Sequence, residues 1–528
     1  MPDQQPSPGP WGWDLPSSSP TPDPPVERQP DPPRRFRRTA ALTVAGTVLP
    51  GLGLIAARRR VVGGVILGLF GLTLATLGIW AALDWQGLLG QFVKPAVLYA
   101  TSSVLVVLAL VWVGVVVASH LSLRGRASRP QRVAGGVLVA LLAFSVAAPM
   151  AIAARYSYET ASSVEGVFKS QDDSRSATRP TLGGKPTKGR PAPVDPWADK
   201  PRLNVLLLGG DAGEGRTGTR TDTVILASID TKSGDTTLFS LPRNTGRMPF
   251  PKKSKLSKYY PSGFTNGDGN SADYFLNAMY DSVPNTVPKD VLGETDNLGA
   301  DALKISVGEA LGLQVDYYVL INLQGFSKMI NALGGIRLNI NTYIPIGGNT
   351  DLGIPPKEFL EPGPNQKLNG REALWYARGR FGSDDFARMD RQRCVINAII
   401  EQANPRNMLA RYEDVAKAGK QIVLTDMPQE VLPLMVDLSL RVKDGNVRSI
   451  VFKHGKEGFL SPNPDFDRMR KRVKVAIGEA KQAPSGASTT KKPSSSGSAK
   501  PKQAESEDVA DSCAYNPKMA ATAEPYRG

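Results

Sequence analysis

Cysteine and histidine are scarce in this chain, with two of each among 528 residues. Cys394 and Cys513 lack the neighbouring cysteines or histidines of a structural zinc site, and we expect no disulfide framework. Cys394 lies in an apolar helical pattern, which predicts a buried thiol. His120 and His454 are too few and too isolated for a histidine metal site or a catalytic triad.

Acidic residues are outnumbered by basic ones, which leaves a formal net charge of +15. Such an excess can indicate nucleic-acid binding. Here, much of the basic charge lies in arginines that border apolar segments and in lysines of low-complexity stretches, and we find no helix-turn-helix or other nucleic-acid motif. We therefore expect no nucleic-acid partner.

Apolar periodicity is missing from three stretches. Residues 1–38 are proline-rich, residues 157–201 are rich in Ser, Thr, Pro, Gly and Lys, and residues 482–528 consist mainly of Ser, Lys, Ala and Pro. These compositions predict a disordered cytoplasmic tail, a linker and a second disordered tail. What remains is a hydrophobic block at 39–156 and one globular domain at 202–481.

The hydrophobic block contains three stretches long enough to cross a bilayer, at residues 61–83, 95–120 and 133–154. A fourth stretch, 39–57, is shorter and is broken by Pro50-Gly51. Arginine clusters flank it on both sides, and such clusters prefer the cytoplasmic face. We therefore expect a re-entrant or interfacial helix there rather than a crossing.

The charge of the connecting loops predicts the orientation of this block. The loop 84–94 has little net charge, whereas the loop 121–132 carries four arginines. The first loop is then outside and the second inside. These features predict a multi-pass plasma-membrane protein with a cytoplasmic N-terminus and an extracytoplasmic globular domain. The alternative has four crossings and a cytoplasmic domain.

The globular domain alternates strand and helix patterns. Strands are predicted at 205–208, at 223–229 and 236–241 as a hairpin, at 317–322 and at 336–340, with helices at 301–311 and 326–333. The alternation indicates an α/β fold with a mostly central sheet. Residues 245–297 show few periodic signals, and we expect a long, mobile loop beside the functional site.

Short polar motifs follow several of these elements. Asp211 comes directly after a buried strand, where ligands of α/β sheets tend to bind. Guanidinium groups grip phosphate bidentately, and Mg²⁺ prefers one or two carboxylates plus substrate phosphates. Each motif alone has an ordinary explanation, such as a local salt bridge or a solvated cationic helix face, but their combination indicates a pyrophosphate site. The residues concerned are Asp211, Arg220, Asp222, Arg243, Arg378, Arg380, Arg388, Arg391 and Gln392.

The order and residues of these motifs resemble the LytR-CpsA-Psr family of cell-wall glycopolymer transferases, and the membrane block is similar to that of actinobacterial members. The matching segments are 204–211, 220–223, 240–243, 316–335, 368–380 and 385–392. The resemblance implies a three-layer domain with a central mixed sheet. It also implies that Asp211 and Asp222 hold Mg²⁺ (or Mn²⁺) and that Arg220, Arg243 and Asp211 are catalytic. The pyrophosphate-binding positions that it implies are Arg220, Arg243, Arg378, Arg380, Arg388 and Gln392.

Two further expectations come from the resemblance. Apolar side chains in this family form a tunnel for a polyprenyl chain, and the candidates here are Tyr317, Phe326, Met329, Ile330 and Ile340, for which core packing is an equally good explanation. The family usually has Pro-Arg-Asp where this chain has Pro-Arg-Asn at 242–244. Asparagine removes a charge, which puts any role of that carboxylate in doubt but leaves the metal pair unaffected.

The implied activity is transfer of a glycopolymer, or its linkage unit, from a polyprenyl-pyrophosphate carrier to a peptidoglycan hydroxyl, with formation of a phosphodiester. Either Asp211, Asp384, Asp385 or the lipid phosphate is the candidate proton acceptor. Two alternatives remain open: a regulatory membrane protein that binds polyprenyl phosphates without catalysis, and a hydrolase of polyprenyl pyrophosphates.

Overall fold

The computed structural model describes residues 32–84, 87, 90–125, 128–180, 197, 200–211, 219–267, 271–349, 352–402, 423–456, 459–479 and 507–526. The proline-rich segment 1–31, part of the predicted linker at 181–196, and most of the predicted second tail at 480–506 lie outside these residues. The chain divides into two compact units. One contains residues 1–73 and 109–148, and the other contains residues 74–108 and 149–528.

The hydrophobic block is helical where it is described. It consists of α1 (Pro32–Val48), α2 (Leu52–Ala56), α3 (Arg60–Leu83), α5 (Pro95–Leu123) and α6 (Arg129–Val167). Three of these helices, α3, α5 and α6, are long and apolar enough to cross a membrane. They contain the three stretches that the sequence predicts as spans.

The chain reverses between α1 and α2. Gly51 adopts a left-handed conformation with φ of 100°, and a Cβ atom there would lie 2.3 Å from the carbonyl oxygen of Gly63. A Cβ on Gly46 would likewise lie 3.0 Å from the amide of Gly53, so the two helices pack closely. The two helices are interrupted at Pro50-Gly51, as the sequence suggests. That this helical hairpin is re-entrant or interfacial stays a prediction.

The domain is built on a mixed sheet of seven strands within the described residues, in the order β11-β10-β3-β2-β1-β4-β9. Strands β1, β2 and β3 are antiparallel neighbours, whereas β4 pairs parallel with β1 and β10 pairs parallel with β3. The strands are β1 (Arg202–Gly210), β2 (Thr221–Asp230), β3 (Thr236–Leu241), β4 (Tyr317–Asn322), β9 (Val423–Thr425), β10 (Val447–Val451) and β11 (Glu507–Asp508). The predicted α/β class with a central mixed sheet is confirmed.

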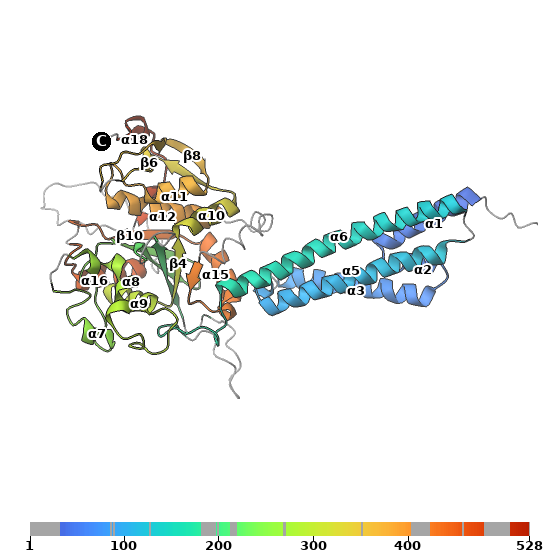
Figure 1. Cartoon of the computed structure of the whole chain (residues 1–528), viewed down its shortest axis with the longest axis horizontal. Coiled ribbons are helices and arrows are strands. Elements are labelled where there is room, and N and C mark those ends of the chain that lie inside the picture. Colours follow the sequence, from blue (N-terminus) through green and yellow to red (C-terminus); the bar gives the residue numbers. More distant parts are fainter. Residues whose placement is uncertain are drawn as a thin grey trace, which may run out of the picture. The chain divides into compact units, whose positions relative to one another are not determined.

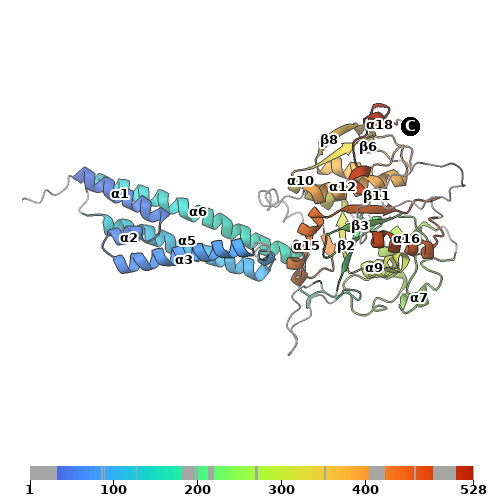
Figure 2. The ribbon, with the colours of Figure 1, turned by 180° about the vertical axis from the view of Figure 1, so that it is seen from behind.

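Helices cover both faces of this sheet, as Figures 1 and 2 show. On one face, Leu206, Leu226 and Phe239 pack in a core with α8 (Met279–Thr286), α9 (Leu298–Leu311) and α16 (Phe466–Glu479). On the other lie α10 (Leu323–Leu333), α11 (Gly370–Arg378), α12 (Asp385–Gln402) and α15 (Leu432–Asp444). β1 is buried because both of its faces are covered, which explains its nearly continuous apolar sequence.

The predicted strand at 336–340 forms, but it lies outside the central sheet. It is β5 (Ile336–Ile340), which pairs antiparallel with β8 (Gly363–Leu368), and a second small sheet joins β6 (Ile344–Ile346) to β7 (Glu358–Leu360). Ile336, Leu338 and Ile340 face a separate core shared with α11 and α12. Their alternation specifies a half-buried strand but does not specify its partner.

The segment 245–297 differs from the expected mobile loop, because it contributes to the main core. Met248, Leu256, Phe264 and Leu276 have no exposed surface. Its elements are α7 (Leu256–Tyr259), η1 (Ala272–Tyr274), η2 (Leu276–Ala278) and α8, and except for α8 they span only three or four residues. Elements this short produce no helical periodicity, which is why the sequence shows no signal.

The segment that follows α6 is attached to the domain instead of forming a free linker. The carboxylate of Asp301 accepts hydrogen bonds from the hydroxyls of Ser176 and Thr178, at 2.8 and 2.7 Å, and from the amide of Ala177 at 2.9 Å. Asp301 is buried, so these bonds satisfy a charge that would otherwise be costly. Residues 176–178 are therefore fixed against α9.

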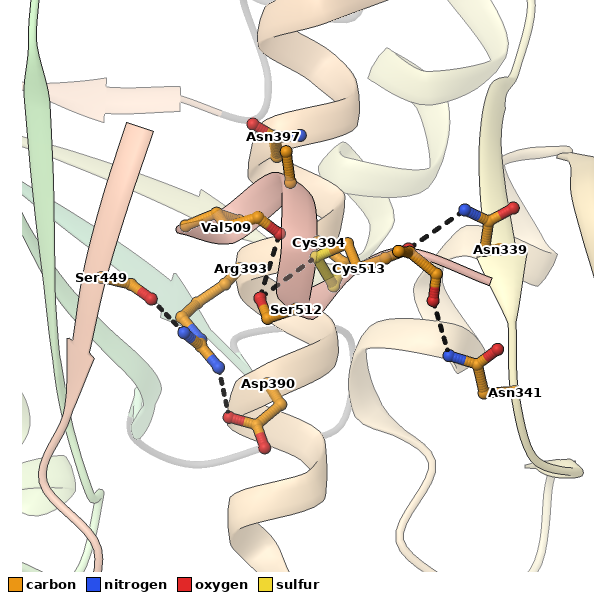
Figure 3. Close-up of a disulfide and its surroundings, with 12 residues drawn as sticks. Asn339, Asn341, Asp390, Arg393, Cys394, Asn397, Ser449, Val509, Ser512 and Cys513 are labelled. Atoms are coloured by element: carbon orange, nitrogen blue, oxygen red, sulfur yellow. Dashed lines mark hydrogen bonds and ion pairs between the residues drawn. A yellow bond between two sulfur atoms is a disulfide. The ribbon is translucent and has the colours of Figure 1, made fainter. Parts of the chain in front are cut away.

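The expectation of a free Cys394 thiol is wrong, since Cys394 and Cys513 form a disulfide (Figure 3). The prediction of a wholly disordered tail at 482–528 is wrong for residues 507–526, which we call the strap. Val509 is fully buried against β2, β3 and β10, and the side chains of Asn339 and Asn341 donate to the carbonyls of Cys513 and Ala514. Two cysteines 119 residues apart in a low-complexity context give no sequence signal for pairing.

Candidate functional site

The candidate carboxylates lie where β1 ends and β2 begins. The amide of Asp211 donates to the carbonyl of Arg220 at 3.1 Å, and the Asp211 carboxylate accepts from the amide of Arg220 at 2.9 Å. Gly209 pairs with Thr223 but Gly210 pairs with Thr221, so Asp222 is the extra residue of a β-bulge. A bulge changes the direction of the side chains beside it, and this bulge lies at the end of β1, next to Asp211.

Asp222 is surrounded by donors from three different elements. Its Oδ1 accepts from Arg243 at 2.8 Å, and the Nδ2 of Asn277 lies 3.5 Å away. Burial opposes ionisation of this carboxyl, but the charge and hydrogen bond of Arg243, the charge of Arg388 and the Asn277 amide outweigh it, so the pKa of Asp222 is lowered. Asp222 is therefore ionised at neutral pH.

Arg388 connects this carboxylate to α12. Its guanidinium lies 2.9 Å from Asp385 and donates to the carbonyl oxygen of Asp222 at 3.1 Å. The side chain is only 4% exposed, and burial lowers the pKa of Arg388 to about 10, so it stays charged at neutral pH. Its buried Nε has no hydrogen-bond partner among the described residues. A solvated cationic face is thus the wrong explanation for Arg388.

Arg391 is also buried, and it has a structural role. Its guanidinium donates to the carbonyls of Tyr376, at 2.7 Å, and of Gly379. These carbonyls belong to the last turn of α11 and the residue that follows it, which have no partner within the helix. Arg391 therefore fastens the end of α11 to α12.

The remaining predicted cations lie around this junction. The guanidinium of Arg378 stacks 4.8 Å above the ring of Trp375, and Gln392 donates to the carbonyl of Ala377 at 3.3 Å. The positive charge of Arg380 is close enough to Arg388 to disfavour its protonation. The end of α11 and the start of α12 thus bring like charges together, an arrangement that an anion stabilises.

Arg220 occupies a more open position. Its side chain is half exposed and forms an ion pair with Asp273 of η1 at 3.0 Å. Because Asp273 is itself largely exposed, this pair contributes little to stability and leaves Arg220 accessible to a ligand. Asn244, which replaces the expected aspartate, is exposed in the turn after Arg243.

An apolar cavity adjoins the arginines. It has a volume of about 180 Å³. It lies between the face of β1, β2 and β4 that carries Leu207, Ile225 and Val319 and the helices α10, α11 and α12. Its polar lining residues are Thr223, Asn322, Arg378 and Gln392. The apolar side chains that line it include Leu207, Ile225, Val319, Ile321, Phe326, Met329, Val395, Ile396 and Ile399.

Two of the five lipid-tunnel candidates, Phe326 and Met329, line this cavity. The other three are core residues. Ile330 and Ile340 pack in the core of the small sheet, since Ile330 is on the side of α10 that faces β5. Tyr317 shares a strand face with Val319 and Ile321 but lies nearer the start of β4, where Met427 and Leu432 cover it.

Asn277 is a site residue that sequence reasoning missed. Its backbone amide donates to the carbonyl of Arg243 at 3.0 Å, its side chain is beside Asp222, and it is 6% exposed. Its buried Oδ1 has no hydrogen-bond partner among the described residues. The only available signal was a polar residue between Leu276 and Ala278, both of which are buried, in a segment without periodicity.

The described residues contain no group of three or more His, Cys, Asp or Glu side chains placed to hold a metal ion. Mg²⁺, however, is usually held by one or two carboxylates together with substrate phosphates. Asp211 and Asp222 at one sheet edge, with the unpartnered amide oxygen of Asn277 beside Asp222, fit that mode of binding.

A family model described as the LytR_cpsA_psr family matches residues 160–458. The polyisoprenyl-teichoic acid–peptidoglycan teichoic acid transferase TagU of Oceanobacillus iheyensis is 28% identical over 250 residues, which cover 46% of this chain and 63% of that protein. Biofilm regulatory protein A of Streptococcus mutans is 25% identical over 313 residues, which cover 56% of this chain and 69% of that protein.

Among solved structures, B. subtilis TagV is 23% identical, with a TM-score of 0.36, and the match covers 53% of this chain and 97% of that structure. The chain spans less than two thirds of the length of the first curated relatives that it matches. The family match extends over more than half of the chain and includes the described site residues from Asp211 to Gln392. The chain therefore belongs to the LytR_cpsA_psr family.

Proposed function

We propose that this protein transfers a glycopolymer, or its linkage unit, from a polyprenyl-pyrophosphate carrier to a hydroxyl of peptidoglycan. The observation that carries the proposal is an apolar cavity with Arg378 in its lining, a residue close in the chain to Arg380 and Arg388, because a lipid pyrophosphate needs both apolar walls and cations. The apolar walls suit an isoprenoid chain, and Arg378 and Gln392 at their edge suit the first phosphate. The names of related transferases support the same class of donor.

In this proposal the arginines bind and orient the pyrophosphate. Arg378, Arg380 and Arg388 hold its non-bridging oxygens, and Arg220 reaches it from the open side. Arg243 has a second task, since its ion pair with Asp222 keeps that carboxylate oriented. Asp211 and Asp222, with Asn277 beside them, are the residues that would hold Mg²⁺ (or Mn²⁺), which supplies Lewis-acid polarisation of the phosphate oxygens when bound.

The reaction joins the acceptor oxygen to the sugar-side phosphorus. The bond from that phosphorus to the bridging oxygen breaks, a phosphodiester forms, and polyprenyl phosphate leaves. We assign the hydroxyl proton to the departing phosphate. Asp384 is an unsuitable acceptor because it caps α12 by accepting from the amide of Ala387 at 2.7 Å, and Asp385 contacts both Arg243 and Arg388.

The disulfide supports the location that this function requires. Disulfides persist in oxidising compartments outside the cytoplasm. A bond between Cys394 and Cys513 therefore favours a domain on the outer face of the plasma membrane, with α3, α5 and α6 as crossings and a cytoplasmic N-terminus.

Product analysis tests the proposal. The full chain, purified in detergent with Mg²⁺, is given a polyprenyl-pyrophosphate-linked glycan with and without peptidoglycan fragments, and Asp222→Ala serves as the inactive control. The expected product is a glycan joined to muramic acid through a phosphodiester, formed only with acceptor. Free glycan phosphate formed equally with and without acceptor would indicate the hydrolase. Donor binding without turnover, and wall attachment in cells unchanged by Asp222→Ala, would indicate the regulatory lipid-binding protein.

A further inference from the structure

The strap connects several elements around the candidate site, although it is far from them in sequence. Its first residues add β11 to the edge of the central sheet, where β11 pairs antiparallel with β10. Val509 is buried below it, and Cys513 is bonded to Cys394 of α12, the helix that carries Arg388 and Gln392 (Figure 3). The strap is thus fixed at several points and covalently at one.

The strap then crosses the end of β5 and the residue that follows it. Asn339 and Asn341 donate to the carbonyls of Cys513 and Ala514 at 3.1 and 3.0 Å, and the amide of Asn516 donates back to Asn341 at 2.8 Å. These bonds use backbone groups, so they fix the path of the strap independently of most of its side chains. The path leads towards the loop between α11 and α12.

The strap ends its described course on that loop. The ring of Tyr526 lies 5.6 Å from the ring of Phe381, measured between centroids. It also lies against Gly382, where an added Cβ would be only 2.5 Å from the Tyr526 ring. Gly382 has a φ of 74°, which few other residues adopt readily, so both the backbone and the space at this position are adapted to Tyr526.

Arg380 lies between two fixed points of this loop. On one side, Arg391 holds the carbonyl of Gly379 from within the domain. On the other, Tyr526 packs on Phe381 and Gly382 from outside. The loop 379–384 contains no regular secondary structure of its own, so these two contacts restrict the directions in which the Arg380 side chain points.

We propose that Tyr526 is a positioning residue for the donor site, through which the disulfide-anchored strap holds the loop 379–384 and its Arg380 in the pyrophosphate-binding arrangement. This inference rests on the proposed function for the role of Arg380. It assigns a function to a segment that composition alone classifies as a disordered tail. Tyr526 contacts Phe381 and Gly382 of the loop, so in this proposal its effect passes through Arg380.

The test uses the full chain in detergent with farnesyl pyrophosphate and Mg²⁺ as the binding probe. Tyr526→Ala should weaken binding about three- to tenfold, within the range of couplings between neighbouring residues, whereas Tyr526→Phe should bind like the wild type. Because Tyr526 is 57% exposed, its removal should leave the fold intact. Met519→Ala, which alters a similarly exposed strap residue in α18 (Pro517–Ala521), is the matched control and should bind like the wild type.

A double-mutant cycle separates positioning from general stability. In an Arg380→Ala background, Tyr526→Ala should cause no further loss of affinity, and reduction of the disulfide should weaken binding to the wild type but not to Arg380→Ala. Unchanged binding by Tyr526→Ala, or an equal loss in both backgrounds, would overturn the inference.

Hydrogen exchange of the loop provides a readout that needs no ligand. Tyr526→Ala should speed amide exchange in residues 379–384 and leave exchange in β1 unchanged. If the loop exchanges faster but the wild type fails to bind farnesyl pyrophosphate, the proposed function is wrong and the structural contact stands. If loop exchange is unchanged, the positioning role is wrong whatever the ligand.

Discussion

Replacing Arg391 by methionine separates the structural arginine from the ligand-binding ones. The guanidinium makes two hydrogen bonds, to the carbonyls of Tyr376 and Gly379, and hydrogen bonds from charged donors contribute roughly 1.5–3 kcal/mol each. Part of the stabilisation from these two hydrogen bonds is offset, because burial disfavours the charged form of Arg391 and lowers its pKa. We expect the free energy of unfolding to fall by about 2–4 kcal/mol, mostly because two buried carbonyls lose their donor.

Thermal unfolding of the full chain in detergent, followed by circular dichroism, measures this loss. A change of 2–4 kcal/mol corresponds to a decrease in Tm of roughly 3–7 °C for a domain of this size. Arg380→Met is the matched comparison, because it removes a neighbouring guanidinium and should lower donor binding with little change in Tm. An Arg391→Met variant that unfolds like the wild type but no longer binds donor would refute the structural role and place Arg391 among the ligand contacts.

Four further predictions follow from the site and the strap. Asp222→Ala should slow transfer by the equivalent of about 2–4 kcal/mol in initial-rate assays, since a preorganised charge near the phosphates is lost. Because the pKa of Asp222 is lowered in the fold, its ionised carboxylate stabilises the fold at pH values above the ordinary carboxyl pKa, and this stabilisation is lost as the pH falls through the lower folded value. Tm measured below about pH 5 should therefore decrease with acid, and the decrease should be smaller in Asp222→Asn. Cys513→Ser should lower the free energy of unfolding in urea titrations by about 5 kcal/mol, from the loop-closure entropy of a 119-residue separation. Ile396→Trp should fill the cavity and raise KM roughly tenfold for long polyprenyl donors, whereas binding of inorganic pyrophosphate should not change.

The elements predicted from the sequence are those whose pattern is local. The apolar run of β1, the β2–β3 hairpin and the i, i+3, i+4 spacing of α10 each contain their own signal, and all three form. The site motifs were also recognisable, because Asp211 directly follows β1 and Arg243 lies two residues after β3, and the central sheet places both strands beside β2. The family membership that their order indicates is confirmed.

Features that depend on distant packing were not predictable. A disulfide between residues 119 positions apart, the burial of Val509 and the pairing of β5 outside the central sheet all depend on where the chain returns in space. The spacing of Arg388 and Arg391 correctly indicates one helix face, but only the structure shows that both are buried, Arg388 beside Asp222 and Arg391 against the end of α11. Asn277 was missed because short 3₁₀ turns have no period that a sequence can reveal.

The separation between the two cysteines also constrains the order of assembly. Cys394 is in a helix of the core, whereas its partner is made 119 residues later. If the chain is exported as it is synthesised, α12 reaches the outside with the Cys394 thiol unpaired until Cys513 has also been exported. Covalent closure then comes after the synthesis of α12, and a chain interrupted before residue 513 contains the core helix but lacks its disulfide.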